Sequence, residues 1–233
     1  MIFWSLNDSE VICIDMLFLD LSNVFDTIPH DKLLLKLCSL GITGDYLLLI
    51  KNSITGRYQF TSFNNICSQS VKIRSGVPQG GVLSPEEFNM YVSDIPEILK
   101  CNNFEFADDL VIISIVKNTN DIDILQSDLL NLENYCNEKE LKLNAQKTKH
   151  LRIGLKDCNL SGYVLQNEII ETVNSHKHLG VTYDNKMSFN FHCNDIINKA
   201  YSKYNVMKHI CNQVDGQTFL RIYKTYTTYC RIQ

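Results

Sequence analysis

The sequence predicts an α+β fold with one continuous main core, and three observations support this. Short β-prone runs alternate with stretches in which apolar residues recur every three to four positions, as they do in helices. Of the 233 residues, 45% are hydrophobic and 21% are charged, so there is enough apolar material for a sizeable core. The sequence contains no internal repeats, low-complexity tracts or obvious linkers. This length suits one large domain, or one and a half small ones.

The first expected elements are a strand, two helices and a β-pair. Residues 11–21, VICIDMLFLDL, predict a buried strand with Asp20 near its end. Leucines at helical spacing predict a helix within HDKLLLKLCSLGI, and a second helix is expected over about 43–53. RYQFTSF and CSQSVKIR predict two paired strands joined by the turn Asn64–Asn65.

A loop dense in glycine and proline, SGVPQGGVLSP, is predicted to open a third helix. Ser84, Pro85 and Glu87 fit an N-cap, a first-turn proline and a capping-box glutamate. Pro96 is expected to kink or end this helix. Its apolar face is formed by Phe88, Tyr91, Val92 and Ile95.

The second half of the chain begins with FADDLVIIS, which predicts a strand–turn–strand unit around Asp108. A long helix is expected over about 121–139, followed by strands at ELKLN and KHLRIG, at YVLQNEIIETV and at HKHLGVTYD. Two helices are expected to close the chain. Their apolar faces are predicted to hold Ile196, Ala200, Tyr204, Met207 and Cys211 in one, and Phe219, Ile222, Tyr223 and Tyr226 in the other.

Composition narrows the function classes. The net charge of −4 argues mildly against a nucleic-acid binder, although a local basic groove can lie on an acidic protein. Nine cysteines are scattered singly without a CxxC pair, which makes a structural zinc site unexpected. The first ten residues lack the features of a signal peptide. The sequence contains no run of about 18 apolar residues, so we expect no membrane span. We therefore expect an intracellular protein in the cytoplasm or nucleus, with reduced thiols.

Adjacent aspartates at the edge of an apolar run have two interpretations. Asp108 and Asp109 are either a polar hairpin turn or part of a metal site with Asp20, which ends the first strand. Three carboxylates brought together need a counter-charge, and Mg²⁺ prefers carboxylate oxygens and substrate phosphates. Two such ions, roughly 3.5–4 Å apart, stabilise an in-line displacement at phosphorus. Mn²⁺ is a possible substitute.

Five segments together resemble the reverse transcriptase domain of non-LTR (LINE-type) retrotransposons. They are FLDLSNVFDTIPHDKLLLKL, SGVPQGGVLSPEEFNMYVSDIP, FADD, LKLNAQKTKHLRIG and the stretch from HKHLGVTYD to VMKHI. The resemblance runs from about residue 12 to about residue 230. It implies a polymerase palm with an antiparallel sheet, packed helices and residual fingers elements over 1–175. It also implies a primer-grip region with a partial thumb or connection over 176–233. Most of the fingers are expected to be missing.

The resemblance also implies roles for individual residues. Asp20, Asp108 and Asp109 would be catalytic and hold the metal ions. Phe25 would lie beneath the incoming sugar as a steric gate against a 2′-hydroxyl, although an aromatic residue there is by itself more simply a core residue. The expected cofactor is a pair of Mg²⁺ ions. The expected partners are an RNA template, a DNA primer and dNTPs, with no membrane.

Further positions are carried over in the same way. Gln79 and Gly80 would contact the template–nucleotide pair, and Leu179 and Gly180 would support the primer end. Lys147 would face a phosphate or donate a proton, although taken alone it is more simply a solvated loop lysine.

The implied reaction is RNA-directed DNA polymerisation, in which the primer 3′-hydroxyl attacks the α-phosphate of a dNTP and pyrophosphate leaves. Two alternatives stay open: a catalytically silent remnant that only binds nucleic acid or protein, and an intron-type or other cellular reverse transcriptase. Within the binding loop, Gly81 stands where serine is common and Glu86–Glu87 replaces an apolar pair. The two glutamates suit a helix N-terminus, so we expect them to be harmless for folding.

Overall fold

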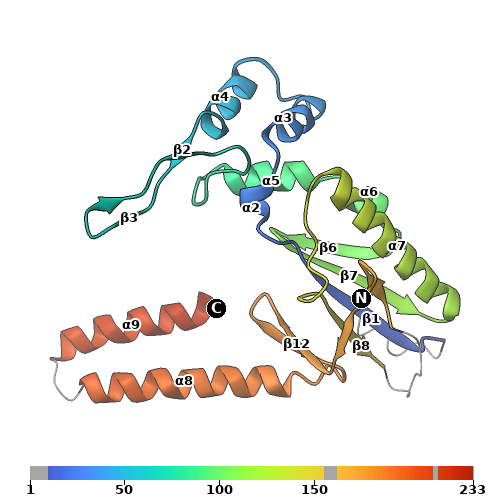
Figure 1. The fold of residues 1–233 in the computed structure, drawn as a ribbon. Coiled ribbons are helices and arrows are strands. Elements are labelled where there is room, and N and C mark those ends of the chain that lie inside the picture. Colours follow the sequence, from blue (N-terminus) through green and yellow to red (C-terminus); the bar gives the residue numbers. More distant parts are fainter. Residues whose placement is uncertain (1–9, 155–161, 212–214, 233) are drawn as a thin grey trace. The chain divides into compact units, whose positions relative to one another are not determined.

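The computed structural model describes residues 10–154, 162–211 and 215–232 (Figure 1). The chain forms two compact units, the first ending at Thr172 and the second beginning at Val173. Each unit is described by itself. In the part of the chain that the structure describes, no helix is both long enough and apolar enough to cross a lipid bilayer.

A five-stranded sheet forms the centre of the first unit, in the order β11-β8-β1-β7-β6. Its strands are β1 (Cys13–Asp20), β6 (Asn102–Phe106), β7 (Asp109–Val116), β8 (Lys149–Ile153) and β11 (Glu171–Val173). β1 lies between β7 and β8 and pairs antiparallel with both. Every residue of β1 except Asp20 is buried, which explains why its sequence is almost continuously apolar. The predicted α+β fold is confirmed.

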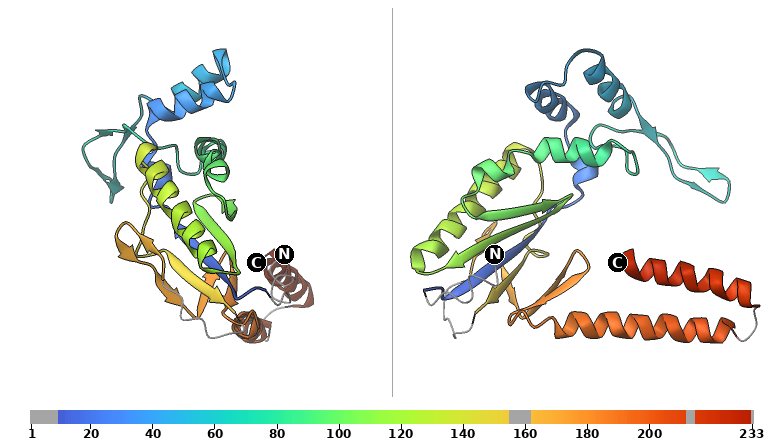
Figure 2. Two further views of the ribbon diagram at one scale, coloured as in Figure 1. Left: turned by 90° about the vertical axis from the view of Figure 1, so that its right-hand side faces the viewer. Right: turned by 180° about the vertical axis from the view of Figure 1, so that it is seen from behind.

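Helix α7 (Thr119–Glu138) lies along one face of the sheet (Figures 1 and 2). It begins two residues before the predicted start because Asn118 and Asp121 form a capping box. The other helices of this unit are α2 (Val24–Thr27), α3 (His30–Ser39), α4 (Gly44–Ile54), α5 (Ser84–Val92) and α6 (Ile95–Ile98). Apolar side chains of α3, α5 and α7 join those of β1 and β7 in one core.

The β-pair predicted from RYQFTSF and CSQSVKIR is a long hairpin between α4 and α5. β2 (Tyr58–Gln59) pairs with β5 (Val71–Lys72), and β3 (Ser62–Phe63) pairs with β4 (Ile66–Cys67). Asn64 and Asn65 form the tip with φ angles of 48° and 63°, a left-handed conformation that asparagine tolerates better than most residues. The tip of the hairpin projects away from the sheet (Figure 2).

Three local predictions were wrong. Leu83, not Ser84, is the N-cap of α5, because the Ser84 hydroxyl donates to the carbonyl of Pro78 at 2.6 Å. Pro96 does not end α5 but lies in the first turn of α6. ELKLN forms no strand: it makes one isolated bridge, between Leu143 and Leu21.

Glu87, which we expected to be harmless for folding, is unfavourable for the stability of the fold. Its side chain is buried, and its Oε2 has no hydrogen-bond partner among the described residues. Burial raises the pKa of this carboxyl group, and the positive charge of Arg57 offsets part of that rise. A buried carboxyl group with an unsatisfied oxygen destabilises the fold, where an apolar residue would not.

The two later strand predictions each correspond to more than one strand. YVLQNEIIETV contains β9 (Val164–Leu165), β10 (Glu168–Ile169) and β11. Its turn residues Gln166 and Asn167 have φ angles of 53° and 62°. In each case the sequence predicted the extended residues but not the turn between them, because the turn residues are not the Asn–Gly pair typical of a tight hairpin.

The second unit contains a hairpin and two helices. β12 (Ser175–His178) pairs antiparallel with β13 (Val181–Asp184) across the turn Leu179–Gly180. α8 (Asn190–Cys211) and α9 (Gly216–Ile232) follow. On the predicted apolar face of α8, Ile196 and Tyr204 are 51% and 58% exposed. The side chains of Cys211, Ile222 and Tyr226 lie outside the described residues.

Candidate active site

Two of the three predicted carboxylates are neighbours across the central strand pair. Asp20, the last residue of β1, is the cross-strand partner of Asp109, the first residue of β7. Residues opposite each other on neighbouring strands have Cβ atoms roughly 4.5–5.5 Å apart. Asp108 lies next to Asp109 in the two-residue turn that joins β6 to β7, and is exposed. The order of the chain therefore gathers all three residues at one end of the sheet.

The turn that carries Asp108 is conformationally costly. Ala107 has a φ of 53°, although a residue with a Cβ atom disfavours the left-handed region. Such strained backbone costs of order 1–3 kcal/mol and collects at functional sites, where the surrounding structure maintains it. Here the pairing of Phe106 with Asp109 closes the turn on both sides.

Asp20 is the residue best prepared to bind a cation. Its Oδ2 is buried and has no hydrogen-bond partner among the described residues, and Lys147 Nζ lies 3.6 Å from it. Lys147 is 67% exposed, so this ion pair is worth little to stability. Within the described ranges, no three His, Cys, Asp or Glu side chains are grouped closely enough to hold a metal ion. The three-aspartate metal site stays a prediction, and its donors are the oxygen ligands that Mg²⁺ prefers.

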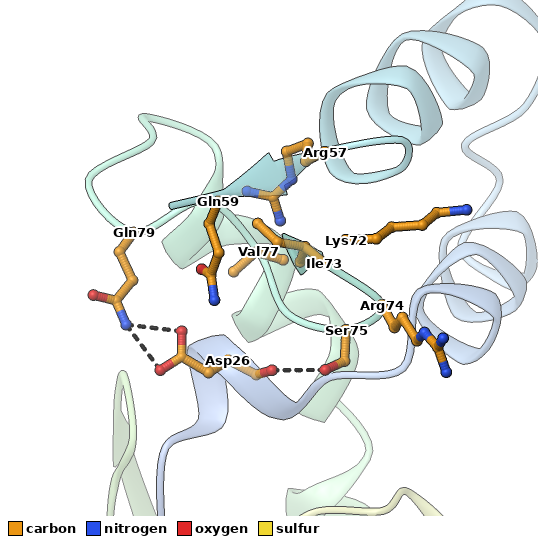
Figure 3. Close-up of a pocket in the computed structure, with 9 residues that line it drawn as sticks. All are labelled: Asp26, Arg57, Gln59, Lys72, Ile73, Arg74, Ser75, Val77 and Gln79. Carbon is orange, nitrogen blue, oxygen red and sulfur yellow. Dashed lines mark hydrogen bonds between the residues drawn. The ribbon is translucent and has the colours of Figure 1, made fainter. Parts of the chain in front are cut away.

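The glycine-rich loop after β5 is fixed to the segment that follows β1. Val77 donates its backbone N–H to the Phe25 carbonyl at 2.7 Å, and the Ser75 hydroxyl donates to the Asp26 carbonyl at 2.9 Å. The Gln79 amide donates to both carboxylate oxygens of Asp26, at 2.9 and 3.0 Å (Figure 3). Two segments about fifty residues apart are thereby held together. Asp26, which directly follows Phe25 in the first motif, had been given no role from the sequence.

Phe25 is half-buried in α2, and its ring lies 5.6 Å from that of Phe88, centroid to centroid. It is therefore supported from behind by the core. Gly76 makes the approach of the loop possible, because a Cβ at this position would lie 2.5 Å from the Phe25 carbonyl oxygen. The Gly76 carbonyl in turn contacts His30 Nε2 at 2.8 Å and accepts from Arg57 at 3.0 Å.

The remaining predicted positions lie in turns. Gly80 has a φ of 78° with open space around it, which leaves its backbone accessible. A Cβ at Gly81 would lie 2.7 Å from the Ser84 hydroxyl oxygen, so the serine expected there would require Ser84 to move. In the second unit, Leu179 and Gly180 have φ angles of 46° and 82° and form the β12–β13 turn.

A cavity of about 640 Å³ lies beside the glycine-rich loop that follows β5, and the sequence did not predict it. Arg57, Lys72 and Arg74 line it together with Asp26 and Gln79 (Figure 3). Three separate segments contribute these residues. A count of charges along the hairpin could have revealed its basic character, but not the cavity.

A second charged cluster lies on the other face of the sheet. Asp15 is five positions before Asp20 on β1, so the two side chains point to opposite faces. Asp15 is fully buried and accepts from Arg152 at 2.7 and 2.8 Å and from Tyr163 at 2.6 Å. His150 Nε2 lies 3.1 Å away, close enough for an electrostatic contact but not aligned as a hydrogen bond.

Burial by itself would raise the pKa of Asp15, but the hydrogen bonds and the positive charges around it hold that pKa well below its usual range. The pKa of Tyr163 is raised by burial and by the negative charge of Asp15. The cluster connects β1, β8 and the segment before β9.

A palm-like sheet that ends in paired carboxylates, next to a glycine-rich loop, is the arrangement typical of nucleic-acid polymerases. Residues 11–183 match the family model described as "Reverse transcriptase (RNA-dependent DNA polymerase)". The chain belongs to this family. It is 26% identical to a probable RNA-directed DNA polymerase from transposon BS of Drosophila melanogaster, over 96% of this chain and 26% of that protein. It is 28% identical to the RNA-directed DNA polymerase from mobile element jockey of Drosophila funebris, over 89% of this chain and 24% of that protein.

The chain thus spans about a quarter of the length of these curated relatives. Together with the family match, they identify it as a reverse transcriptase domain of the LINE type. Among solved structures, an apo telomerase from Candida Tropicalis has a similar fold, with a TM-score of 0.55 at 12% identity, covering 80% of this chain and 34% of the telomerase. This similarity confirms the palm fold.

Proposed function

We propose that the chain catalyses RNA-directed DNA synthesis, with a DNA primer, an RNA template and dNTPs as substrates, in the cytoplasm or nucleus. The observation that carries the proposal is the cross-strand pair of Asp20 and Asp109, with a buried, unpartnered oxygen on Asp20. Reverse transcriptases use divalent metal ions. Asp20, Asp109 and the adjacent Asp108 would hold two Mg²⁺ ions, with Mn²⁺ as a substitute.

The ions, when bound, supply positive charge for the attacking and leaving oxygens. The chain's own residues do the rest. Lys147, whose Nζ lies 3.6 Å from Asp20 Oδ2, would face a phosphate or donate a proton. Gln79, held by Asp26, fixes the loop against which the template–nucleotide pair would rest. Phe25, braced by Phe88, would exclude a 2′-hydroxyl. Leu179 and Gly180 would support the primer end.

Primer extension on an RNA template, with the purified chain, tests this proposal. Asp20→Asn and Asp109→Asn should each lower extension by at least roughly 100-fold, because each removes a carboxylate from the site that stabilises transition-state charge. Asp45→Asn, which neutralises an acid in the first turn of α4, is the matched control and should leave the rate unchanged. Chelation of divalent ions should abolish extension by the unmodified chain.

A binding module without catalysis is the second candidate. It is favoured by the lack of a preformed three-carboxylate group within the described residues. In that case the chain would bind an RNA–DNA hybrid with the same affinity before and after Asp20→Asn, and would extend no primer with Mg²⁺ or Mn²⁺. Extension that depends on Asp20 would exclude this candidate.

A further inference from the structure

The charge of this chain is unevenly distributed. The whole sequence has 26 acidic and 22 basic residues, yet no acidic residue lies between Asp45 and Glu86. The same stretch contains Lys51, Arg57, Lys72 and Arg74. A local basic stretch on an acidic protein concentrates positive potential where an anionic ligand can use it.

The last three of these cations line the cavity of about 640 Å³ beside the glycine-rich loop. Asp26 is the acidic residue among the lining side chains, and both of its carboxylate oxygens accept from Gln79. Lys72 and Arg74 are exposed, and neither side chain forms a hydrogen bond or ion pair within the described part of the chain. Their charges are therefore not neutralised by any side chain that the structure describes.

Arg57 is held differently. Its Nε donates to the Ile54 carbonyl at 3.1 Å and its Nη2 donates to the Gly76 carbonyl at 3.0 Å. A guanidinium has five N–H donors, so three stay available after these two bonds. Figure 3 shows the guanidinium directed into the space between Gln59 and Val77. A fixed arginine with free donors suits recognition of a phosphate group.

Exposed aromatic side chains lie near these cations on the ribbon formed by the paired strands β2 and β5. Tyr58 is the cross-strand partner of Lys72, so both side chains lie on one face of the β2–β5 pair, and Arg74 follows two residues after the end of β5. Tyr58 and Phe60 are 63% and 61% exposed. Cations interleaved with exposed aromatic rings are the pattern by which proteins bind single-stranded nucleic acid, since phosphates contact the cations and bases stack on the rings.

We propose that the cavity and the β2–β5 ribbon bind single-stranded nucleic acid, with Arg57, Lys72 and Arg74 contacting its phosphates and Tyr58 stacking on a base. The inference rests on the proposed function to the extent that the strand is the RNA template. A free dNTP offers the same phosphate chemistry. We favour a nucleic-acid strand, because a ligand must be longer than one nucleotide to contact both the cavity and the aromatic side chains of the β2–β5 ribbon.

Fluorescence anisotropy with a labelled single-stranded RNA of about 15 nucleotides tests the inference. The measurement uses the full chain, without divalent ions or nucleotide, over roughly 50–200 mM salt. The test variant is the double substitution Lys72→Gln and Arg74→Gln, since neither side chain supports the fold. The control is Lys51→Gln with Lys100→Gln, which removes the same charge from exposed side chains outside the cavity.

Each phosphate contact to a single strand contributes about 0.7 to the slope of log affinity against log salt. The test variant should therefore lower the magnitude of the slope by about 1.4 and weaken binding roughly 25-fold near 0.1 M salt, while the control variant keeps both close to those of the unmodified chain. Tyr58→Ala should weaken binding by roughly fivefold or more with an unchanged slope.

Unchanged affinity and slope in the test variant would overturn the inference. An unchanged RNA affinity with a raised KM for dNTP in primer extension would instead assign the cavity to the nucleotide. Asp20→Asn should bind RNA as tightly as the unmodified chain. A chain that binds RNA through Lys72 and Arg74 but extends no primer would contradict the proposed function and leave this inference standing.

Discussion

Gly76 is the position where one added methyl group should do most damage to the site. Its φ is +83°, which costs a residue with a Cβ roughly 1–2 kcal/mol. An added Cβ would also lie 2.5 Å from the Phe25 carbonyl oxygen and 2.7 Å from Asp26 Cα. Both are backbone atoms, so the loop and α2 must separate, and overpacking of this kind costs about 1–3 kcal/mol. Gly76→Ala should therefore lower the free energy of unfolding by about 2–5 kcal/mol.

Gly80→Ala is the matched control, because Gly80 has nearly the same φ, 78°, with no atom within 4 Å of an added Cβ. It should cost only the conformational term, about 1–2 kcal/mol. Urea unfolding followed by circular dichroism compares the two variants. Hydrogen exchange at the Val77 amide, which donates to Phe25, gives a local readout. Protection there should fall in Gly76→Ala and persist in Gly80→Ala. Equal stability losses with equal Val77 protection would refute the clash.

Three further predictions concern the nucleotide, the metal pair and the buried cluster. Phe25→Val should raise rNTP relative to dNTP incorporation by about 5- to 150-fold, and an unchanged ratio would contradict the steric gate. Lys147→Gln should slow extension, yet change the free energy of unfolding by less than about 1 kcal/mol, because its ion pair with Asp20 is exposed; equal losses in both would contradict this. Asp15→Asn should cost about 3–5 kcal/mol at neutral pH. Because the folded-state pKa of Asp15 is lowered, that difference should be constant above about pH 4 and shrink as pH falls, which pH-dependent unfolding measures.

The sequence was sufficient for the elements in which local pattern and tertiary environment agree. The apolar run of β1 is buried on both faces, and the FADD turn is closed by strand pairing. The sequence was insufficient where a contact between distant residues decides the local structure. Ser84 has the right residue type for an N-cap, but its hydroxyl is engaged by Pro78 across a tight loop. ELKLN has the alternation of a strand, but its pairing with the chain after β1 stops at one bridge, in which Ser22 donates to the Lys142 carbonyl and Asn144 donates to the Asp20 carbonyl. Thr148 then donates to the Asn144 carbonyl in a turn.

The site was predictable in its carboxylates and unpredictable in its supports. Asp20 and Asp109 end and begin strands, so antiparallel pairing alone brings them together. The contact between Asp26 and Gln79 joins residues 53 positions apart and depends on the path of a loop that carries no periodic signal. The cavity depends on Arg57 being held by the carbonyls of Ile54 and Gly76, which again no local pattern encodes.

Three local costs coincide at the end of β1. Asp20 and Asp109 are like charges directly opposite each other, which is unfavourable in a sheet. Asp20 Oδ2 is buried without a hydrogen-bond partner among the described residues, and Ala107 adopts a left-handed φ in the neighbouring turn. Each cost has a cheaper alternative, such as asparagine for an aspartate or glycine for Ala107. Natural sequences break local rules chiefly where function requires it. A bound cation would reduce the first two costs together, because it would offset the like charges and give Asp20 Oδ2 a closer partner than Lys147 Nζ, which lies 3.6 Å away. Divalent ions should therefore stabilise the unmodified chain against thermal unfolding, and the gain should disappear in Asp20→Asn.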